Sequence, residues 1–183
     1  IVIGSMITTV QDTFATIFAE GDGFRRDGSQ FNLMLSDGDT FSLGGLEARA
    51  FHLPGHTPAF MAYLIVDALF VGDTLFMPES STARRDFPAG DATSLYESCQ
   101  RLLALPDESR LFVCHDYQPG GRDFAFESTV AEQQVHNIYI GDGIWADEFV
   151  AMLESRGAGL AMPTLILPSQ QVNMSAGILP PID

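Results

Sequence analysis

The sequence predicts a single layered α/β domain over residues 1–183. Short strands come first and helices interleaved with strands follow, which is the element order of layered α/β folds. Residues 60–65 and 68–71 are nearly continuous apolar runs of strand length, as in a sheet covered on its inner face. Apolar residues make up 46% of the chain and include 14 Phe, enough for a buried core.

The N-terminal part is expected to place one helix among short strands. Residues 8–18 repeat apolar side chains at helical spacing from Val10 to Phe18, and Thr8 or Thr9 can act as the N-cap. Glycine-rich turns then separate short apolar runs. The expected strands are 1–3, 40–43 and 46–52, and residues 21–29 are expected to form a loop.

The second half is expected to alternate helices with strands. Asp91 is a good N-cap for a helix whose apolar side chains repeat from Leu95 to Leu103, until Pro106 ends it. Residues 110–113 then read as a buried strand. We further expect helices at 127–138 and 146–154 and a short last strand at 165–167.

The charge balance argues against several classes of partner. Asp and Glu number 24 against 9 basic residues, all of them Arg, for a net charge of −15. This charge repels nucleic acids and anionic lipid, and a small anionic substrate would need a local Arg cluster. No apolar stretch approaches the length of a membrane span. Cys99 and Cys114 fit reduced thiols, so we expect a cytoplasmic protein.

Three polar segments follow expected strands, and each carries a possible metal ligand. His56 lies in Pro54-Gly55-His56-Thr57, Asp73 in Gly72-Asp73-Thr74, and His115 in Cys114-His115-Asp116-Tyr117. Taken singly, a turn histidine bonded to the backbone or a capping aspartate explains each one. Their repetition at strand ends favours a site at the edge of a layered sheet.

Other reactive side chains have weaker contexts. His52 lies in a strand and His136 in a helix, so both are expected to be structural, and Cys99 is expected to pack in the core. Arg84 and Arg85 lie in an aperiodic stretch, where Arg84 can bind a carboxylate through two hydrogen bonds. In the alternative interpretation one of these Arg pairs with Asp86 and the other is solvated.

The segments PGHT, GDT and CHDY, in this order, resemble those of the metallo-β-lactamase fold. FVGDTLFMP, T-A-R-x-D-F and LPDESRLFVCHDY are similar to its persulfide dioxygenase branch, the ethylmalonic-encephalopathy-type sulfur dioxygenases. The resemblance spans essentially the whole chain and implies an αββα sandwich with a mononuclear Fe(II). The ion would be held by two His and one Asp, leaving positions for O2 and a persulfide sulfur.

The resemblance also implies roles for individual residues. His56 and Asp73 correspond to iron ligands, and His115 corresponds to a residue that completes a second metal site in dinuclear relatives. Tyr117 and Arg84 would lie on the substrate side, near the glutathione moiety of a persulfide. The family's H-x-H-x-D-H segment is absent, since residues 1–51 contain no histidine. We therefore expect an N-terminally truncated sandwich with impaired activity.

Three functions remain open from the sequence. The leading one is an iron-dependent persulfide dioxygenase that oxidises a glutathione-type persulfide with O2 to sulfite. The second is a zinc-dependent thioester hydrolase of the glyoxalase II kind, because PGHT and GDT are shared with such hydrolases. The third is a non-catalytic half-domain that associates with a separate piece or, as a homodimer, with a second copy.

Overall fold

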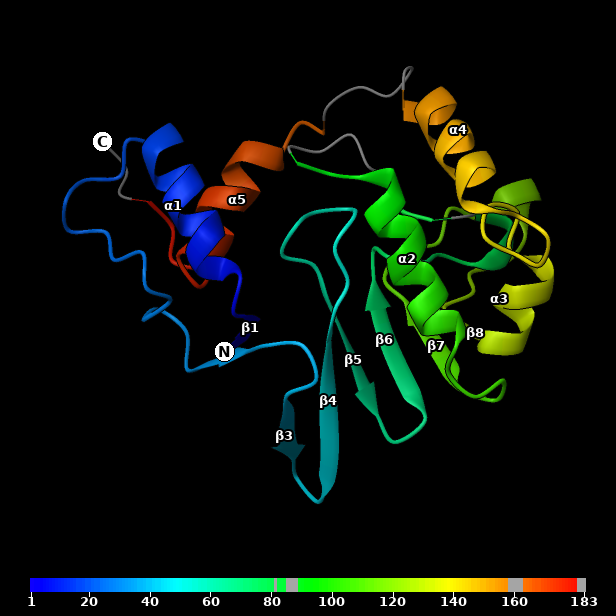
Figure 1. Cartoon of the computed structure of the whole chain (residues 1–183). Coiled ribbons are helices and arrows are strands. Elements are labelled where there is room, and N and C mark those ends of the chain that lie inside the picture. The colour runs from blue at the N-terminus through cyan, green and yellow to red at the C-terminus, as the bar shows by residue number, and fades with distance from the viewer. Residues whose placement is uncertain (81, 85–88, 158–162, 181–183) are drawn as a thin grey trace. The chain divides into compact units, whose positions relative to one another are not determined.

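The computed structural model describes residues 1–80, 82–84, 89–157 and 163–180, which fall into two compact units (Figure 1). The described residues of Ile1–Ser36 and Leu160–Asp183 make up the first unit, and those of Asp37–Gly159 the second. The single domain expected over 1–183 stays a prediction. Among the described residues, every helix is too short or too polar to cross a membrane, and the cytoplasmic location also stays a prediction.

The first unit joins a two-stranded sheet to two helices. Strand β1 (Val2–Gly4) pairs in parallel with β2 (Leu33–Leu35), and α1 (Ile7–Ile17) contacts α5 (Ile166–Met174). The fully buried Gln11 on α1 donates from Nε2 to the Met174 carbonyl at 2.9 Å and accepts from the Gly28 amide at 2.9 Å. A buried side-chain amide thus satisfies backbone groups of two other segments.

Two predictions for this unit are wrong in detail. The helix expected at 8–18 exists as Ile7–Ile17, but Met6 is at its N-cap and makes no capping bond, while Thr8 donates to the Ser5 carbonyl at 3.3 Å. The strand expected at 165–167 is instead the start of α5. Pro168 falls in the first turn of α5, where a helix has no acceptor for its amide anyway, so it does not oppose helix formation.

The second unit contains a six-stranded mixed sheet in the order β3-β4-β5-β6-β7-β8. All neighbouring pairs are antiparallel except β6 and β7, which are parallel. Two of the expected strands match the structure residue for residue, 40–43 and 46–52, as does the later one at 110–113. The strands are β3 (Thr40–Leu43), β4 (Leu46–His52), β5 (Met61–Ile65), β6 (Ala68–Gly72), β7 (Arg110–Val113) and β8 (Glu127–Thr129).

Three α-helices lie in the described part of the second unit. Helix α2 (Ala92–Leu103) begins as predicted, with the Asp91 carboxylate accepting from the Ser94 amide at 2.7 Å. Helix α4 (Ala146–Gly157) extends past the predicted 146–154. The helix predicted from 127 begins only at Val130, as α3 (Val130–His136), because residues 127–129 pair with β7 as an edge strand. Thr129 and Glu132 then form a capping box.

The core of this unit is formed by the sheet together with helices α2, α3 and α4; α2 lies over one face of the sheet, and α4 packs against α2 (Figure 1). Alternate side chains of β6 and β7, such as Leu69 and Leu111, point into it and are fully buried. On the opposite face Phe112 stacks between Phe70 and Phe126, at centroid distances of 5.3 and 6.4 Å. Phe70 is 44% and Phe126 64% exposed. Association with a partner or a second copy stays a prediction.

The directions of the strands bring three polar segments to the same edge of this sheet. Because β4 and β6 are both antiparallel to β5, they run in the same direction, and β7 runs parallel to β6. The carboxyl ends of β4, β6 and β7 therefore lie at the same edge. The loops that leave these three ends are the segments of His56, Asp73 and His115.

We expect Gly55→Ala to destabilise the protein strongly. Gly55 has φ of +139°, and a Cβ there would lie 2.4 Å from the Cα of Leu95 in α2. Backbone strain and overpacking together should lower the free energy of unfolding by about 2–5 kcal/mol in urea denaturation. Gly45→Ala is the matched control, because a Cβ at Gly45 meets nothing within 4 Å. Equal stabilities for the two variants would contradict this account.

Candidate metal centre

His56 is held by a loop that is closed by backbone bonds. The Leu53 amide donates to the Phe60 carbonyl at 2.9 Å, and the Asp91 amide that precedes α2 donates to the Gly55 carbonyl at 2.8 Å. The His56 side chain contacts a residue outside this loop: its Nδ1 lies 2.7 Å from the carbonyl of Arg84. Since a carbonyl only accepts, Nδ1 carries a proton, and in the neutral imidazole Nε2 then presents its lone pair.

Asp73 leaves β6 through a bulge and a left-handed glycine. The pairing of β6 with β7 shifts register between Phe70 and Gly72, and Gly72 has φ of +53°. A Cβ at Gly72 would lie 2.6 Å from the ring of Phe60. Both the positive φ and this close contact therefore favour glycine at this position. The carboxylate that follows lies with Oδ2 at 3.6 Å from His56 Nε2.

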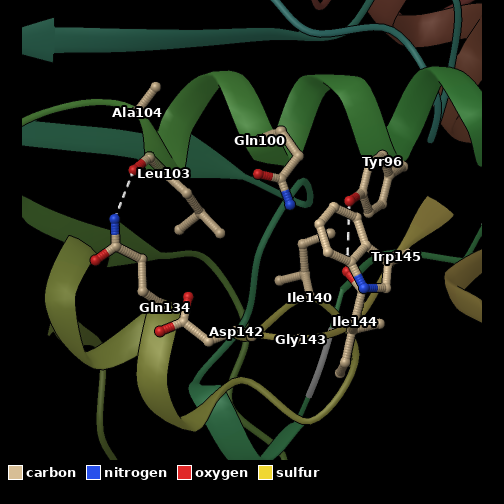
Figure 2. A pocket seen from close by; sticks show the side chains of 11 residues that line it. Tyr96, Gln100, Leu103, Ala104, Gln134, Ile140, Asp142, Gly143, Ile144 and Trp145 are labelled. Carbon is tan, nitrogen blue, oxygen red and sulfur yellow. Dashed lines mark hydrogen bonds between the residues drawn. The ribbon is translucent and has the colours of Figure 1, made fainter.

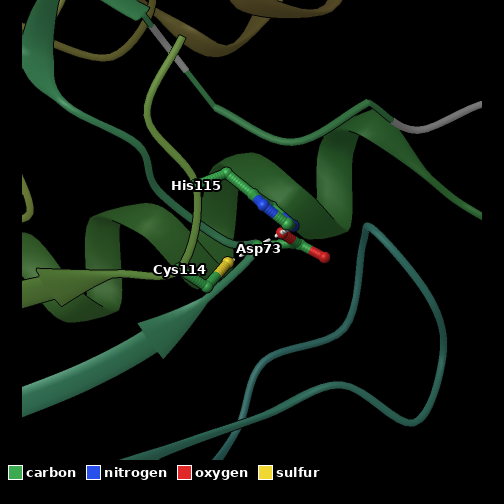
Figure 3. Close-up of side chains that lie close together, drawn as sticks. All are labelled: Asp73, Cys114 and His115. Carbon is green, nitrogen blue, oxygen red and sulfur yellow. Dashed lines mark hydrogen bonds and ion pairs between the residues drawn. The ribbon is translucent and has the colours of Figure 1, made fainter. Parts of the chain in front are cut away.

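His115 and Cys114 reach the same carboxylate from the end of β7 (Figure 3). His115 Nε2 lies 3.2 Å from Asp73 Oδ1, and Cys114 Sγ donates to the same oxygen at 2.9 Å. Burial, followed by the Asp73 carboxylate, raises the pKa of the Cys114 thiol to about 12. Tyr117, two residues after His115, is 64% exposed. Its ring lies edge-on to that of Phe76, with 5.6 Å between the ring centroids.

The loop that carries His115 and Tyr117 is braced by a partly buried ion pair. The carboxylate of Asp116 is 5% exposed and accepts two bonds from Arg122, at 2.6 and 2.8 Å, and one from the Ala125 amide at 2.9 Å. Arg122 also bonds Glu79. The bonds from Arg122 hold the pKa of Asp116 far below its usual value. Their stabilising effect is present at neutral pH and is lost as the pH falls below about 4.

The donor atoms at this edge suit a divalent metal ion. Asp73, Cys114 and His115 offer ligand atoms within 4.8 Å of one another, and the imidazole of His56 faces the same carboxylate. Imidazole and carboxylate donors are compatible with both Fe(II) and Zn(II). The residues present therefore fit a metal ion, although they include no donor from residues 1–51.

The structure brings together most of the side chains singled out from the sequence. His56, Asp73 and His115 meet at one sheet edge, and Tyr117 lies beside them. Arg84 contacts the site through its main-chain carbonyl, and Arg85 lies outside the described residues. His52 bonds the Pro58 carbonyl through Nε2 at 2.7 Å, in line with a structural role.

Two contributions were missed or undervalued by sequence reasoning. Arg122 was not singled out, because nothing in its spacing from Asp116 indicates that the intervening loop folds back. Its position six residues on, after Gly120-Gly121 with φ of +71° and +78°, is the signal that a tight reversal could have given. Cys114 was expected only to be a reduced thiol, since a thiol beside a histidine does not reveal which carboxylate it faces.

A cavity of about 260 Å³ lies elsewhere, between the end of α2 and the turn before α4 (Figure 2). Two of its polar side chains bond main-chain carbonyls within the protein: Tyr96 donates to the Ile144 carbonyl at 3.4 Å and Gln134 to the Leu103 carbonyl at 2.9 Å. The cavity holds no histidine or cysteine. The titratable cluster at the sheet edge is therefore the better candidate for chemistry.

Comparison with known proteins identifies relatives along nearly the whole chain. A family profile described as "Metallo-beta-lactamase superfamily" matches residues 11–115. A probable metallo-hydrolase of Burkholderia pseudomallei is 53% identical over 98% of this chain, and glyoxylase B2 of Dictyostelium discoideum is 47% identical over 98%. The chain spans 65% and 62% of the lengths of these two relatives. A hydroxyacylglutathione hydrolase of Methylococcus capsulatus is 39% identical over 58% of this chain and 40% of its own length.

Among solved structures, ETHE1 from Myxococcus xanthus has a TM-score of 0.73 at 24% identity, covering 97% of this chain and 88% of its own. At this identity the likeness concerns the fold. Together with the family profile it confirms the predicted α/β fold of the metallo-β-lactamase type. The predicted absence of an N-terminal part stays a prediction.

Arg122→Ala should loosen the loop of His115 and Tyr117 without unfolding the sheet. The amides of Gln118 and Ala125, which donate to Asp116, should exchange with deuterium faster, while the amides of α2 stay protected. Arg110→Ala is the control, because Arg110 pairs with Asp67 and Glu127 at the opposite end of β7. Unchanged exchange at residues 116–125 would contradict the bracing role.

Proposed function

The chain belongs to the metallo-β-lactamase superfamily, and from this premise we propose that His56 and Asp73 hold the catalytic metal ion of an enzyme acting on a sulfur-containing substrate. The observation that carries the proposal is the pair of His56 Nε2 and Asp73 Oδ2, 3.6 Å apart at the ends of parallel-running strands. Both atoms are acceptors when His56 is neutral and donates from Nδ1 to the Arg84 carbonyl. Two acceptors this close favour a cation between them.

The finer proposal is an iron-dependent persulfide dioxygenase that takes a glutathione-type persulfide and O2. An Fe(II) bound here would supply open coordination positions at which both reactants can meet. The T-A-R-x-D-F and CHDY segments support this activity over others in the superfamily, by their resemblance to the dioxygenase branch.

The chain's own residues would bind and orient the substrate. The Arg84 carbonyl fixes the ring of His56, whose side chain is 11% exposed, so that Nε2 stays aimed at Asp73. The exposed Tyr117 hydroxyl and the Arg84 guanidinium would contact the thiol carrier. Phe76, lying against the rings of both His115 and Tyr117, would keep the sulfur in apolar surroundings.

A second candidate is a zinc-dependent thioester hydrolase. The names of two relatives favour it, glyoxylase B2 of Dictyostelium discoideum and the hydroxyacylglutathione hydrolase of Methylococcus capsulatus. The same His56 and Asp73 would hold the metal, and His115 would be available as a further ligand. The probable metallo-hydrolase of Burkholderia pseudomallei is compatible with this reading as well.

Oxygen uptake distinguishes the two candidates. With Fe(II) loaded, the protein should consume O2 and form sulfite from glutathione persulfide, and Asp73→Ala should abolish both metal retention and turnover. Zinc retention with hydrolysis of a glutathione thioester, and no O2 uptake, would instead establish the hydrolase. Glu97→Ala, an acidic residue on α2, is the control for loss of a carboxylate.

Arg84→Ala should weaken substrate binding more than chemistry. The variant keeps the main-chain carbonyl that orients His56, so the metal content should not change. Loss of a charged hydrogen bond should raise KM about tenfold with a smaller change in kcat. Arg49→Ala, in the middle of β4, should leave both constants unchanged. An unaltered KM in Arg84→Ala would remove Arg84 from the substrate site.

A further inference from the structure

The two oxygens of the Asp73 carboxylate face different partners. Oδ2 lies 3.6 Å from His56 Nε2, whereas Oδ1 takes both the Cys114 thiol at 2.9 Å and His115 Nε2 at 3.2 Å (Figure 3). A carboxylate at the end of a strand can rotate about its side-chain bonds. A donor that holds one oxygen therefore decides where the other oxygen points.

The strand register explains how Cys114 comes to lie opposite Asp73. Strands β6 and β7 pair Phe70 with Phe112 and then Gly72 with Val113, so that Val71 is the extra residue of a bulge. Without this bulge Asp73 would continue the pairing with His115. With the bulge, the next residues in register are Asp73 and Cys114, and the thiol reaches the carboxylate directly.

We infer that Cys114 is a positioning residue of the metal centre: its thiol donates to Asp73 Oδ1 and thereby turns Oδ2 toward His56. Asp73 then binds the metal through Oδ2, and Cys114 stays outside the set of ligands. The inference rests on the proposed metal site at His56 and Asp73, but not on which reaction that site performs.

Charge and chemistry favour donation over ligation by sulfur. A thiol is a weak donor toward neutral acceptors, but a carboxylate acceptor strengthens the bond. His115, which is 57% exposed in its side chain, contacts the same oxygen and is the second holder of Oδ1. Removal of the Cys114 thiol would leave the exposed side chain of His115 to hold the oxygen alone.

The hydrogen bond can be measured without any metal. Infrared spectra of the metal-free protein should contain two S–H stretching bands, from Cys99 and Cys114, with the Cys114 band at lower wavenumber because of the carboxylate. Cys114→Ala should remove that band, and Cys99→Ala should remove the other. Asp73→Ala should shift the Cys114 band upward. A Cys114 band that does not respond to Asp73→Ala would overturn the inference.

Cobalt(II) titration then tests the positioning role. Cys114→Ala should bind Co(II) about tenfold more weakly than the unsubstituted protein, the usual cost of losing a group that orients a ligand, and Cys114→Ser should restore most of the affinity. Unchanged affinity in Cys114→Ala would overturn the inference. A sulfur-to-cobalt charge-transfer band that disappears in Cys114→Ala would also overturn it, because Cys114 would then be a ligand.

The same titration separates this inference from the proposed function. If the unsubstituted protein binds no Co(II), the metal centre itself fails, and the positioning role fails with it. If Co(II) binding depends on Cys114 as expected but neither a persulfide nor a thioester is consumed, the inference holds and the proposed reactions are wrong.

Discussion

The common direction of β4, β6 and β7 is the constraint on which the site depends. Each strand delivers one polar residue within four positions of its carboxyl end, and the three meet only because the strands run the same way. An antiparallel β7 would carry His115 to the opposite edge of the sheet. The mixed sheet thus converts three distant sequence segments into neighbours, with Asp73 at their centre.

Packing then fixes the directions of these side chains. Two glycines with positive φ, Gly55 and Gly72, let the backbone turn where Leu95 and Phe60 leave no space for a Cβ. Ser98 of α2 donates to the Pro54 carbonyl at 2.6 Å, so the helix that covers the core also anchors the His56 loop. The contacts that pack α2 on the sheet therefore also orient the imidazole of His56. A change that destabilises this packing should also disturb the geometry of the site.

The sequence predicted more of this unit than of the other one. Long periodic segments such as α2 and apolar runs such as β7 indicate whether they form a helix or a strand. Repeated polar residues at strand ends led to the prediction that His56, Asp73 and His115 lie together, as they do in the structure. Short segments failed, because three residues such as 127–129 or 165–167 carry no period, and only pairing or packing decides between strand and helix. The roles of Cys114 and Arg122 depend on a bulge and a loop reversal, which are tertiary features.

The net negative charge of the chain would oppose the approach of the anionic thiol that we propose as substrate. The net charge is −15, but at physiological ionic strength charges beyond about 8 Å are largely screened, so the groups near the sheet edge matter most. Arg122 offers little attraction there, because Asp116 and Glu79 already engage it. Under the proposed function, the attraction would come from short-range contacts on the side of Arg84 and from a cation held by Asp73. Capture of an anionic thiol would then depend on a loaded metal site, because the same carboxylate at the sheet edge would hold that cation.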